Sequence, residues 1–170
     1  MSTTLPVTIF IGSLYFIDIV GDLTSDKYVS IIPKLEIKEV IIGTNVISIG
    51  SQAFADCTRL TSITIPDSVT SIGQATFWRC SNLINVTLSN TITVIAPGLF
   101  DSCGSLETIN IPISVKTIYY SSFKNTSLIQ INYNNKIYLH KSAFIADFES
   151  IYGNGIWGDP FTGISTSFTE

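Results

Sequence analysis

The chain has 170 residues and a formal net charge of −4, with hydrophobic residues making up 45% of it and charged residues only 13%. So much apolar material with so little charge excludes an intrinsically disordered chain, because disorder requires low hydrophobicity and high charge. The nine lysine and arginine residues are scattered and form no basic run, so the sequence predicts no nucleic-acid partner.

Residues 1–36 show the alternation typical of strands before any clear repeat begins. Apolar residues stand at Val7, Ile9 and Ile11, and again at Leu14, Ile17 and Ile19. No basic residue precedes Lys27, and the apolar run is short and broken, so we expect neither a signal peptide nor a membrane span. The sequence predicts an N-terminal strand cap over 1–36, whose second apolar group is a degenerate half-repeat.

Residues 37–150 repeat one pattern of apolar positions at a constant spacing, which is slightly shortened before the last unit. The leading residues of the units are Ile37, Leu60, Leu83, Leu106 and Leu128. A later aliphatic column holds Val46, Val69, Ile92, Val115 and Ile137, and a phenylalanine follows at Phe54, Phe77, Phe100 and Phe123. One unit cannot bury these residues alone, so we predict about five stacked coils around a continuous core. The short Ala-Phe segment of each unit is expected to form one helical or 3-10 turn.

The segment LTSITIPDSVTSIGQATFWRCSN, residues 60–82, resembles the BspA-type leucine-rich repeat, L-x-x-I-x-I-P-x-S-V-x-x-I-G-x-x-A-F-x-x-C. The resemblance covers roughly residues 37–150. It implies a leucine-rich-repeat solenoid that is mainly β, with a parallel sheet on one side and short helical or 3-10 turns. Members of this family are surface proteins of bacteria and parasitic protists that serve in adhesion and protein binding, and others are viral. The motif contains no catalytic residue, so it implies none here.

Two columns of residues point outward from the predicted strands. One column holds Glu39, Ser62, Asn85, Thr108 and Gln130, and its neighbour holds Ile41, Thr64, Thr87, Asn110 and Asn132. Solenoids bind through such extended faces, so this nearly uncharged ladder is a candidate recognition face. The alternative is that Thr and Asn are simply tolerated by solvent in stacked coils.

The cysteines Cys57, Cys80 and Cys103 recur at the same repeat position. We interpret them as small buried core residues, with a partial disulfide as the alternative. They contain no C-x₂-C spacing, and the only histidine is His140, so the sequence predicts no metal site and no cofactor. Because no nucleophile–base arrangement is recognisable either, we expect a non-enzymatic protein.

Two aromatic features lie outside the repeat pattern. Trp78 is expected to be exposed and is followed by Arg79, a pair of residue types favoured at protein interfaces. Alternatively, Trp78 lies flat over a neighbouring turn. The tail, residues 151–170, is either a cap that covers the open end of the stack or an arm that docks through Trp157 and Phe161.

These features predict a recognition or adhesion module that binds another protein through the strand face. The alternative is a structural subunit of a larger assembly, such as a virion or surface layer, that docks through its ends. Either role places the protein at a cell surface, outside the cell or in a virion.

Overall fold

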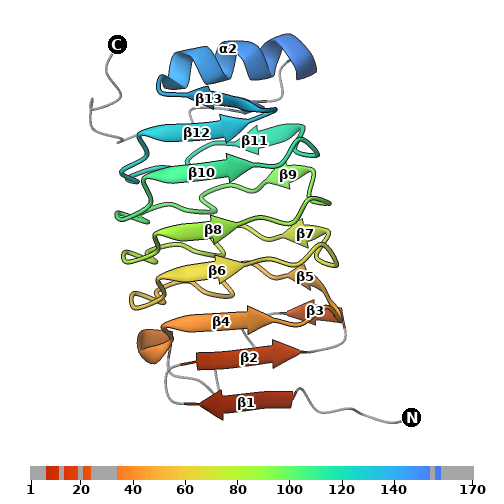
Figure 1. Cartoon of the computed structure of the whole chain (residues 1–170), viewed down its shortest axis with the longest axis vertical. Coiled ribbons are helices and arrows are strands. Elements are labelled where there is room, and N and C mark those ends of the chain that lie inside the picture. The colour runs from red at the N-terminus through yellow and green to blue at the C-terminus, as the bar shows by residue number, and fades with distance from the viewer. Residues whose placement is uncertain (1–6, 12–13, 19–20, 24–33, 154–155, 158–170) are drawn as a thin grey trace.

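The computed structural model describes residues 7–11, 14–18, 21–23, 34–153 and 156–157, with side chains for residues 34–153. The chain winds into a tall stack of coils, with the N-terminal strands at one end and an α-helix at the other (Figure 1). The fold class expected from the repeat, a mainly β solenoid, is confirmed.

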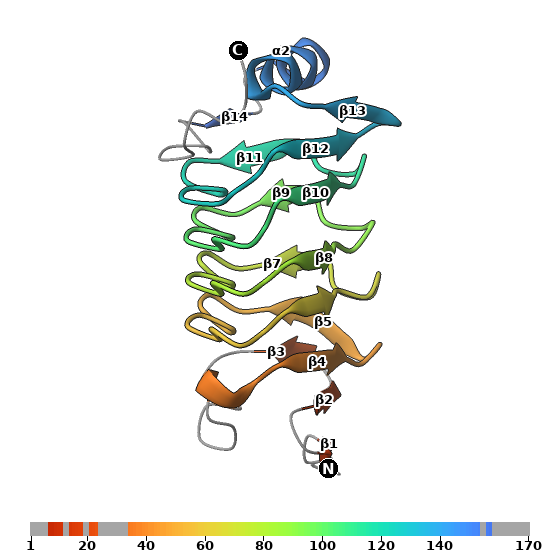
Figure 2. The ribbon, with the colours of Figure 1, turned by 60° about the vertical axis from the view of Figure 1, so that its left-hand side comes forward.

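Each coil contains a front strand and a return strand. The front strands are β4 (Glu39–Ile42), β6 (Ser62–Thr64), β8 (Asn85–Thr87), β10 (Thr108–Ile111) and β12 (Gln130–Tyr133). The return strands are β5 (Val46–Ile49), β7 (Ser71–Ile72), β9 (Val94–Ile95) and β11 (Thr117–Tyr119). The segments from each return strand to the next front strand lie along one side of the stack, at the left in Figure 2, which we call the turn edge.

Parallel pairing places equivalent residues of successive coils beside one another. Glu39 lies opposite Ser62, which lies opposite Asn85, and Asn110 lies opposite Asn132. Because side chains alternate along a strand, this register keeps one column in the core and the next in solvent. The apolar columns of the sequence accordingly fill the interior.

A stack of phenylalanines runs through the core beside the turn edge. The rings of Phe54, Phe77, Phe100 and Phe123 are buried, and successive centroids lie 5.6, 5.5 and 5.8 Å apart with nearly parallel planes. Offset stacking of this kind stabilises aromatic pairs beyond the area that they bury. The one phenylalanine of each repeat therefore links every coil to the next.

The Ala-Phe segments are bent turns in the structure. Each contains two residues with positive φ, which recur at equivalent positions of successive repeats: Gln52, Ala75, Gly98 and Ser121 form one column, and Asp56, Arg79, Ser102 and Asn125 the other. Left-handed residues interrupt helical geometry, because the helix requires negative φ throughout. A 3-10 helix does occur before the first described coil, as η1 (Lys34–Glu36).

The N-terminal end is closed by an antiparallel pair, β1 (Val7–Ile11) and β2 (Leu14–Asp18), followed by β3 (Gly21–Leu23). The repeat pattern of the sequence places Ile17 in register with Val40. In the structure Ile17 lies opposite Ile42, because β2 and β4 pair with an offset longer than the repeat. Strands do precede the repeats as predicted, but their register is shifted by two positions, and Ile19 lies outside the described residues.

At the C-terminal end the repeat pattern gives way to a hairpin. Strand β13 (Lys136–Tyr138) runs antiparallel to β12 after a turn at Asn134 and Asn135, both with positive φ. Two left-handed residues in a two-residue loop are the geometry of a type I′ hairpin turn. The prediction that Ile137 joins the aliphatic core column is therefore wrong: its side chain is 67% exposed, and Tyr138 is buried instead.

The helix α2 (Lys141–Tyr152) covers the last coil. Its residues Phe144 and Phe148, one turn apart, are fully buried against Tyr133. His140 immediately precedes the helix as its N-cap residue. After the helix, β14 (Ile156–Trp157) pairs in parallel with β11. In the described part of the chain, no helix is long and apolar enough to cross a membrane.

The parallel ladders are interrupted at staggered places. On the front, β8 and β10 belong to different sheets, while on the return side the separation falls one coil earlier, between β7 and β9. Between the coils of β7 and β9, side-chain hydrogen bonds join the two coils instead. Ser89 Oγ and Thr91 Oγ1 both donate to the carbonyl of Val69, at 2.7 and 2.9 Å. Every pair of neighbouring coils from residue 37 onward thus keeps at least one intact ladder.

Candidate functional site

The strand face is formed by the outward side chains of β4, β6, β8, β10 and β12. The prediction that the two polar columns point outward is confirmed: Glu39, Thr64, Asn85, Thr87, Thr108 and Asn110 are exposed, and Ser62, Gln130 and Asn132 are half-buried. The face carries one formal charge among these nine residues, that of Glu39. Hydroxyl and amide groups therefore dominate its chemistry.

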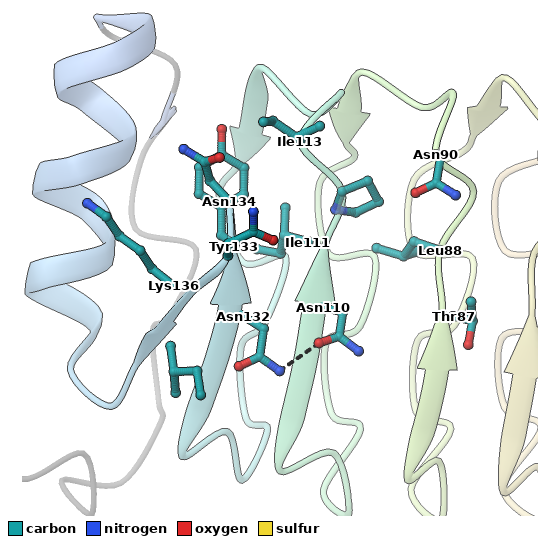
Figure 3. A pocket seen from close by; sticks show the side chains of 13 residues that line it. Thr87, Leu88, Asn90, Asn110, Ile111, Ile113, Asn132, Tyr133, Asn134 and Lys136 are labelled. Atoms are coloured by element: carbon teal, nitrogen blue, oxygen red, sulfur yellow. Dashed lines mark hydrogen bonds between the residues drawn. The ribbon is translucent and has the colours of Figure 1, made fainter.

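A chain of oriented amides runs across the C-terminal half of this face. Gln130 Nε2 donates to Asn132 Oδ1 at 2.8 Å. Asn132 Nδ2 in turn donates to Asn110 Oδ1 at 2.6 Å (Figure 3). The hydrogen bonds of this chain therefore all run in the same direction, from Gln130 through Asn132 to Asn110. Within the described residues, Asn110 Nδ2 has no acceptor, so the chain ends in a free donor near the boundary between β10 and β8.

The largest hollow on the strand face, about 580 Å³, lies beside this amide chain. Its walls are amide and aliphatic side chains, contributed by the ends of β8, β10 and β12 and by the hairpin turn: Thr87, Asn90, Asn110, Ile113, Asn132, Asn134, Asn135 and Ile137. Ile113 and Ile137 are the most exposed aliphatic residues there, at 64% and 67%. The hollow therefore combines polar and apolar contacts within one concave surface.

Among the described residues, Lys136 is the one cation that lines this hollow, and its charge is neutralised by Asp147 of helix α2. Its Nζ lies 2.6 Å from Asp147 Oδ2 on α2, and Tyr138 donates its hydroxyl to the same oxygen at 2.8 Å. The hydrogen bond from Lys136, and then that from Tyr138, lower the pKa of Asp147, while the Asp147 carboxylate raises the pKa of Lys136. Both groups stay charged at neutral pH, and the pair contributes no net charge to the hollow.

Two smaller hollows mark other parts of the strand face. One, of about 310 Å³, lies over β4 and β6 and includes Glu39 and Thr64. The other, of about 260 Å³, lies where β8 and β10 separate, between Ile84, Asn85 and Glu107. The sequence pattern predicts one continuous ladder on the strand face. In the structure, the interruption between β8 and β10 divides this face.

Sequence reasoning missed the hairpin contribution to the main hollow. The repeat pattern assigns Asn134, Asn135 and Ile137 to a further coil, although two adjacent asparagines between apolar residues are themselves a hairpin signal. Asn90 and Ile113 occupy the position after the front strand, where the repeat pattern carries no apolar constraint. Their role becomes visible only when three coils are placed together.

Trp78 lies away from the strand face. It is half-buried on the turn edge, where the Arg79 guanidinium lies 4.2 Å from the centre of its ring. None of the residues around it lines the hollows described above. The backbone of Trp157 pairs with Tyr119 in β11, and Phe161 lies outside the described residues.

The three cysteines are free, buried thiols. Cys80 Sγ donates to the carbonyl of Phe54, and Cys103 Sγ donates to that of Phe77, each at 3.1 Å and each in the preceding coil. Burial raises the pKa of Cys57 to about 12, and burial also raises the pKa values of Cys80 and Cys103. All three therefore stay protonated near neutral pH, and the thiols of Cys80 and Cys103 join their coils to the preceding ones.

The model of the BspA type leucine-rich repeat region matches residues 33–148 in six copies. The chain belongs to this family. The resemblance noted in the sequence is thereby confirmed, and the coil geometry above is that of a BspA-type leucine-rich repeat protein. No curated protein matches the chain.

Several solved structures are similar to this leucine-rich repeat protein. A leucine-rich repeat protein from Bacteroides ovatus is 32% identical, with a TM-score of 0.51, over 59% of this chain and 25% of that one. A leucine rich cell surface protein from Faecalibacterium prausnitzii is 27% identical, with a TM-score of 0.50, over 60% and 32%. The pneumococcal vaccine antigen PcpA is 26% identical, with a TM-score of 0.51, over 58% and 25%. The matched region spans a quarter to a third of these longer chains.

Proposed function

We propose that this leucine-rich repeat protein is a non-enzymatic recognition or adhesion module that binds another protein through its strand face. The observation that carries the proposal is the hollow beside Asn110 and Asn132, where free amide groups and exposed aliphatic side chains share one concave surface. Protein interfaces combine apolar contact with hydrogen bonds in this way, and solenoids bind through such extended faces.

The chemistry of the strand face favours binding over catalysis. Its amide and hydroxyl groups donate and accept hydrogen bonds, and they carry no proton that titrates near neutral pH. Its most exposed aliphatic residues, Ile113 and Ile137, offer area that is released from water when a partner covers it. The similar chain from Faecalibacterium prausnitzii is described as a cell surface protein, which supports a role at a surface.

The proposal is tested by comparing two double variants in affinity capture from the source organism and the surfaces it contacts. Thr87→Arg with Asn110→Arg places bulk and charge in the main hollow, while Trp157→Ala with Phe161→Ala alters the tail. Captured proteins are identified by mass spectrometry, and each purified candidate is then titrated calorimetrically. We expect the strand-face variant to weaken binding at least about tenfold, or about 1.4 kcal/mol, and the tail variant to bind like the wild type.

The circular dichroism spectrum and the melting temperature of both variants serve as controls. Thr87 and Asn110 are exposed, so replacing them should leave the Phe core in place. A partner whose affinity is unchanged in the strand-face variant contradicts the proposal. If the tail variant alone loses the partner, the ends of the molecule are the contact surfaces.

A second candidate function is that of a subunit in a larger assembly that docks through its N-terminal end. It is favoured by strand β1, which pairs with β2 on one side and has no other strand beside it among the described residues. The segment Val7–Ile11 is uncharged, and an uncharged edge strand readily pairs with another chain. The native mass of the particle that contains this 18.6 kDa chain distinguishes the two functions.

A further inference from the structure

A fourth hollow, of about 270 Å³, lies on the turn edge, away from the strand face. Three repeat columns build it from successive coils. One column, which we call the first bank, contains Trp78 and Asp101. The opposite bank contains Gln74, Pro97 and Tyr120. The column between them, the floor, contains Gln52, Ala75, Gly98 and Ser121. Equivalent residues are stacked coil upon coil, so this hollow is a groove that runs along the axis of the solenoid.

Three of the four residues on the floor of this groove, Ala75, Gly98 and Ser121, are small. All four floor residues are left-handed, with φ of 58°, 53°, 61° and 55°, and in the central coil the residue is Gly98, which has no side chain. One coil earlier the floor residue is Ala75, and one coil later it is Ser121. The floor residue is therefore smallest in the coil of Gly98, which lies between the coil of Trp78 and the coil of Tyr120.

The two aromatic residues provide firm apolar walls. The Arg79 guanidinium lies 4.2 Å from the centre of the Trp78 indole ring and 3.9 Å from Asp56, and Trp78 itself lines the groove. Tyr120 stands two coils away on the opposite bank with 53% of its surface exposed. At a strand spacing of ~4.8 Å, two coils separate the walls by about 10 Å along the axis.

The polar groups of the groove are available for a ligand. Within the described residues, the side-chain amides of Gln52 and Gln74 make no hydrogen bond. Asp101 Oδ1 accepts from Ser102 Oγ at 2.8 Å and from Asn125 Nδ2 at 3.4 Å, which leaves its Oδ2 without a donor there. The groove thus offers both donors and acceptors between two aromatic rings.

We propose that this groove binds a neutral carbohydrate chain. The C–H faces of sugar rings pack on aromatic rings, while each sugar hydroxyl is both donor and acceptor and so matches an amide or a carboxylate. The volume suits one ring at a time, and a disaccharide is long enough to reach from Trp78 to Tyr120. A cationic ligand fits less well because the Arg79 guanidinium already lies 4.2 Å from the centre of the indole ring. A proline-rich peptide fits less well because proline has no N–H to donate to the side-chain oxygens of Gln52, Gln74 and Asp101.

The test is a nuclear magnetic resonance titration of the whole isotope-labelled chain. The probes are maltotriose, cellotriose, chitotriose, mannotriose and a galactose disaccharide, together with a decaproline peptide. We expect at least one oligosaccharide to shift the Trp78 indole signal saturably, while the Trp157 indole signal stays in place. Assignment of the two indole signals comes from Trp78→Ala, which also abolishes the binding.

Tyr120→Ala keeps the test decisive if Trp78→Ala fails to fold, because the Tyr120 side chain is exposed. It is expected to weaken binding about tenfold. Lys124→Ala is the matched control, since it lies in the column of Trp78 but outside the groove, and it should bind like the wild type. The strand-face variant Thr87→Arg with Asn110→Arg should also bind the sugar normally, whether or not the strand face binds a protein.

Three outcomes overturn the inference. In the first, no oligosaccharide shifts the Trp78 signal. In the second, binding survives in Tyr120→Ala at wild-type affinity. In the third, decaproline binds at the groove more tightly than every sugar, which assigns it to a proline-rich peptide instead.

Discussion

Single residues set how closely the coils approach one another. Gly73 is the clearest case: a Cβ atom on it would lie 2.4 Å from the backbone nitrogen of Ser51 in the preceding coil. The equivalent residue one repeat later is Ala96, which follows the place where β7 and β9 no longer share a ladder. The close approach of the Ser51 backbone therefore accounts for the glycine at residue 73.

We predict that Gly73→Ala lowers the free energy of unfolding by about 1–3 kcal/mol, because the backbone of Ser51 must move to admit the methyl group. Urea denaturation measures the loss. Gly104→Ala is the matched control, since a Cβ there meets nothing within 4 Å, and it should be neutral or stabilising by up to about 1 kcal/mol. Equal stability of the two variants would show that the coils are less closely packed at Gly73.

At the level of elements, the last coil is completed by parts that are not repeats. Helix α2 buries Phe144 and Phe148 on the exposed end of the core, where a further coil would otherwise be needed. Asp147 of the helix holds Lys136 and Tyr138 of β13, so the hairpin and the helix form one unit. Residues 141–152 thus cover this end of the stack, while the expectation for 151–170, a cap or a docking arm, stays a prediction.

We predict that Phe148→Ala destabilises the protein by about 3–5 kcal/mol, as expected when a fully buried phenylalanine is removed from a core. The comparison is Ile151→Ala, one turn further along α2, whose side chain is 51% exposed and whose removal should change stability by no more than about 0.5 kcal/mol. Thermal and urea denaturation of both variants are the measurements. Similar, small effects would mean that the helix is only loosely docked.

Across the whole molecule, three ladders join the coils, and they are not interrupted at the same coil boundary. The front ladder is interrupted between β8 and β10, and the return ladder between β7 and β9. The turn edge stays continuous: Phe54 donates its amide to Thr76 at 2.9 Å, Phe77 to Leu99 at 3.0 Å and Phe100 to Ser122 at 2.8 Å. The solenoid is thereby held most evenly along the turn edge, while the front and return ladders each have one interruption.

Hydrogen exchange tests this difference directly. The amides of Asn85 and Gln130 donate to the preceding coil, to Thr61 and Glu107, each at 3.2 Å. The equivalent amide of Thr108 has no backbone acceptor among the described residues, because β8 and β10 share no ladder. We predict that the Thr108 amide exchanges at least about tenfold faster than the other two. Equal protection would mean that the front ladder is continuous in solution.

The repeat pattern of the sequence is enough to predict the coil and which of its residues are buried. Apolar columns such as Phe54, Phe77 and Phe100 recur once in every repeat, and only stacking in register buries all of them, so the solenoid and its outward columns could be predicted. Exposure of Thr64, Thr87 and Asn110 follows from the same alternation. A repeat constrains the interior because every coil meets the same neighbour.

The ends of the solenoid and the shape of its surface depend on tertiary contacts that the repeat pattern does not specify. At the ends no equivalent neighbour exists, so β2 pairs with β4 out of the repeat register, and the last unit turns back at Asn134 and Asn135. On the surface, the main hollow and the turn-edge groove are each built from several coils, mostly by residues that no core column constrains. Their shape depends on how closely each coil approaches the next, a spacing that is set by contacts such as that of Gly73 and not by the period of the sequence.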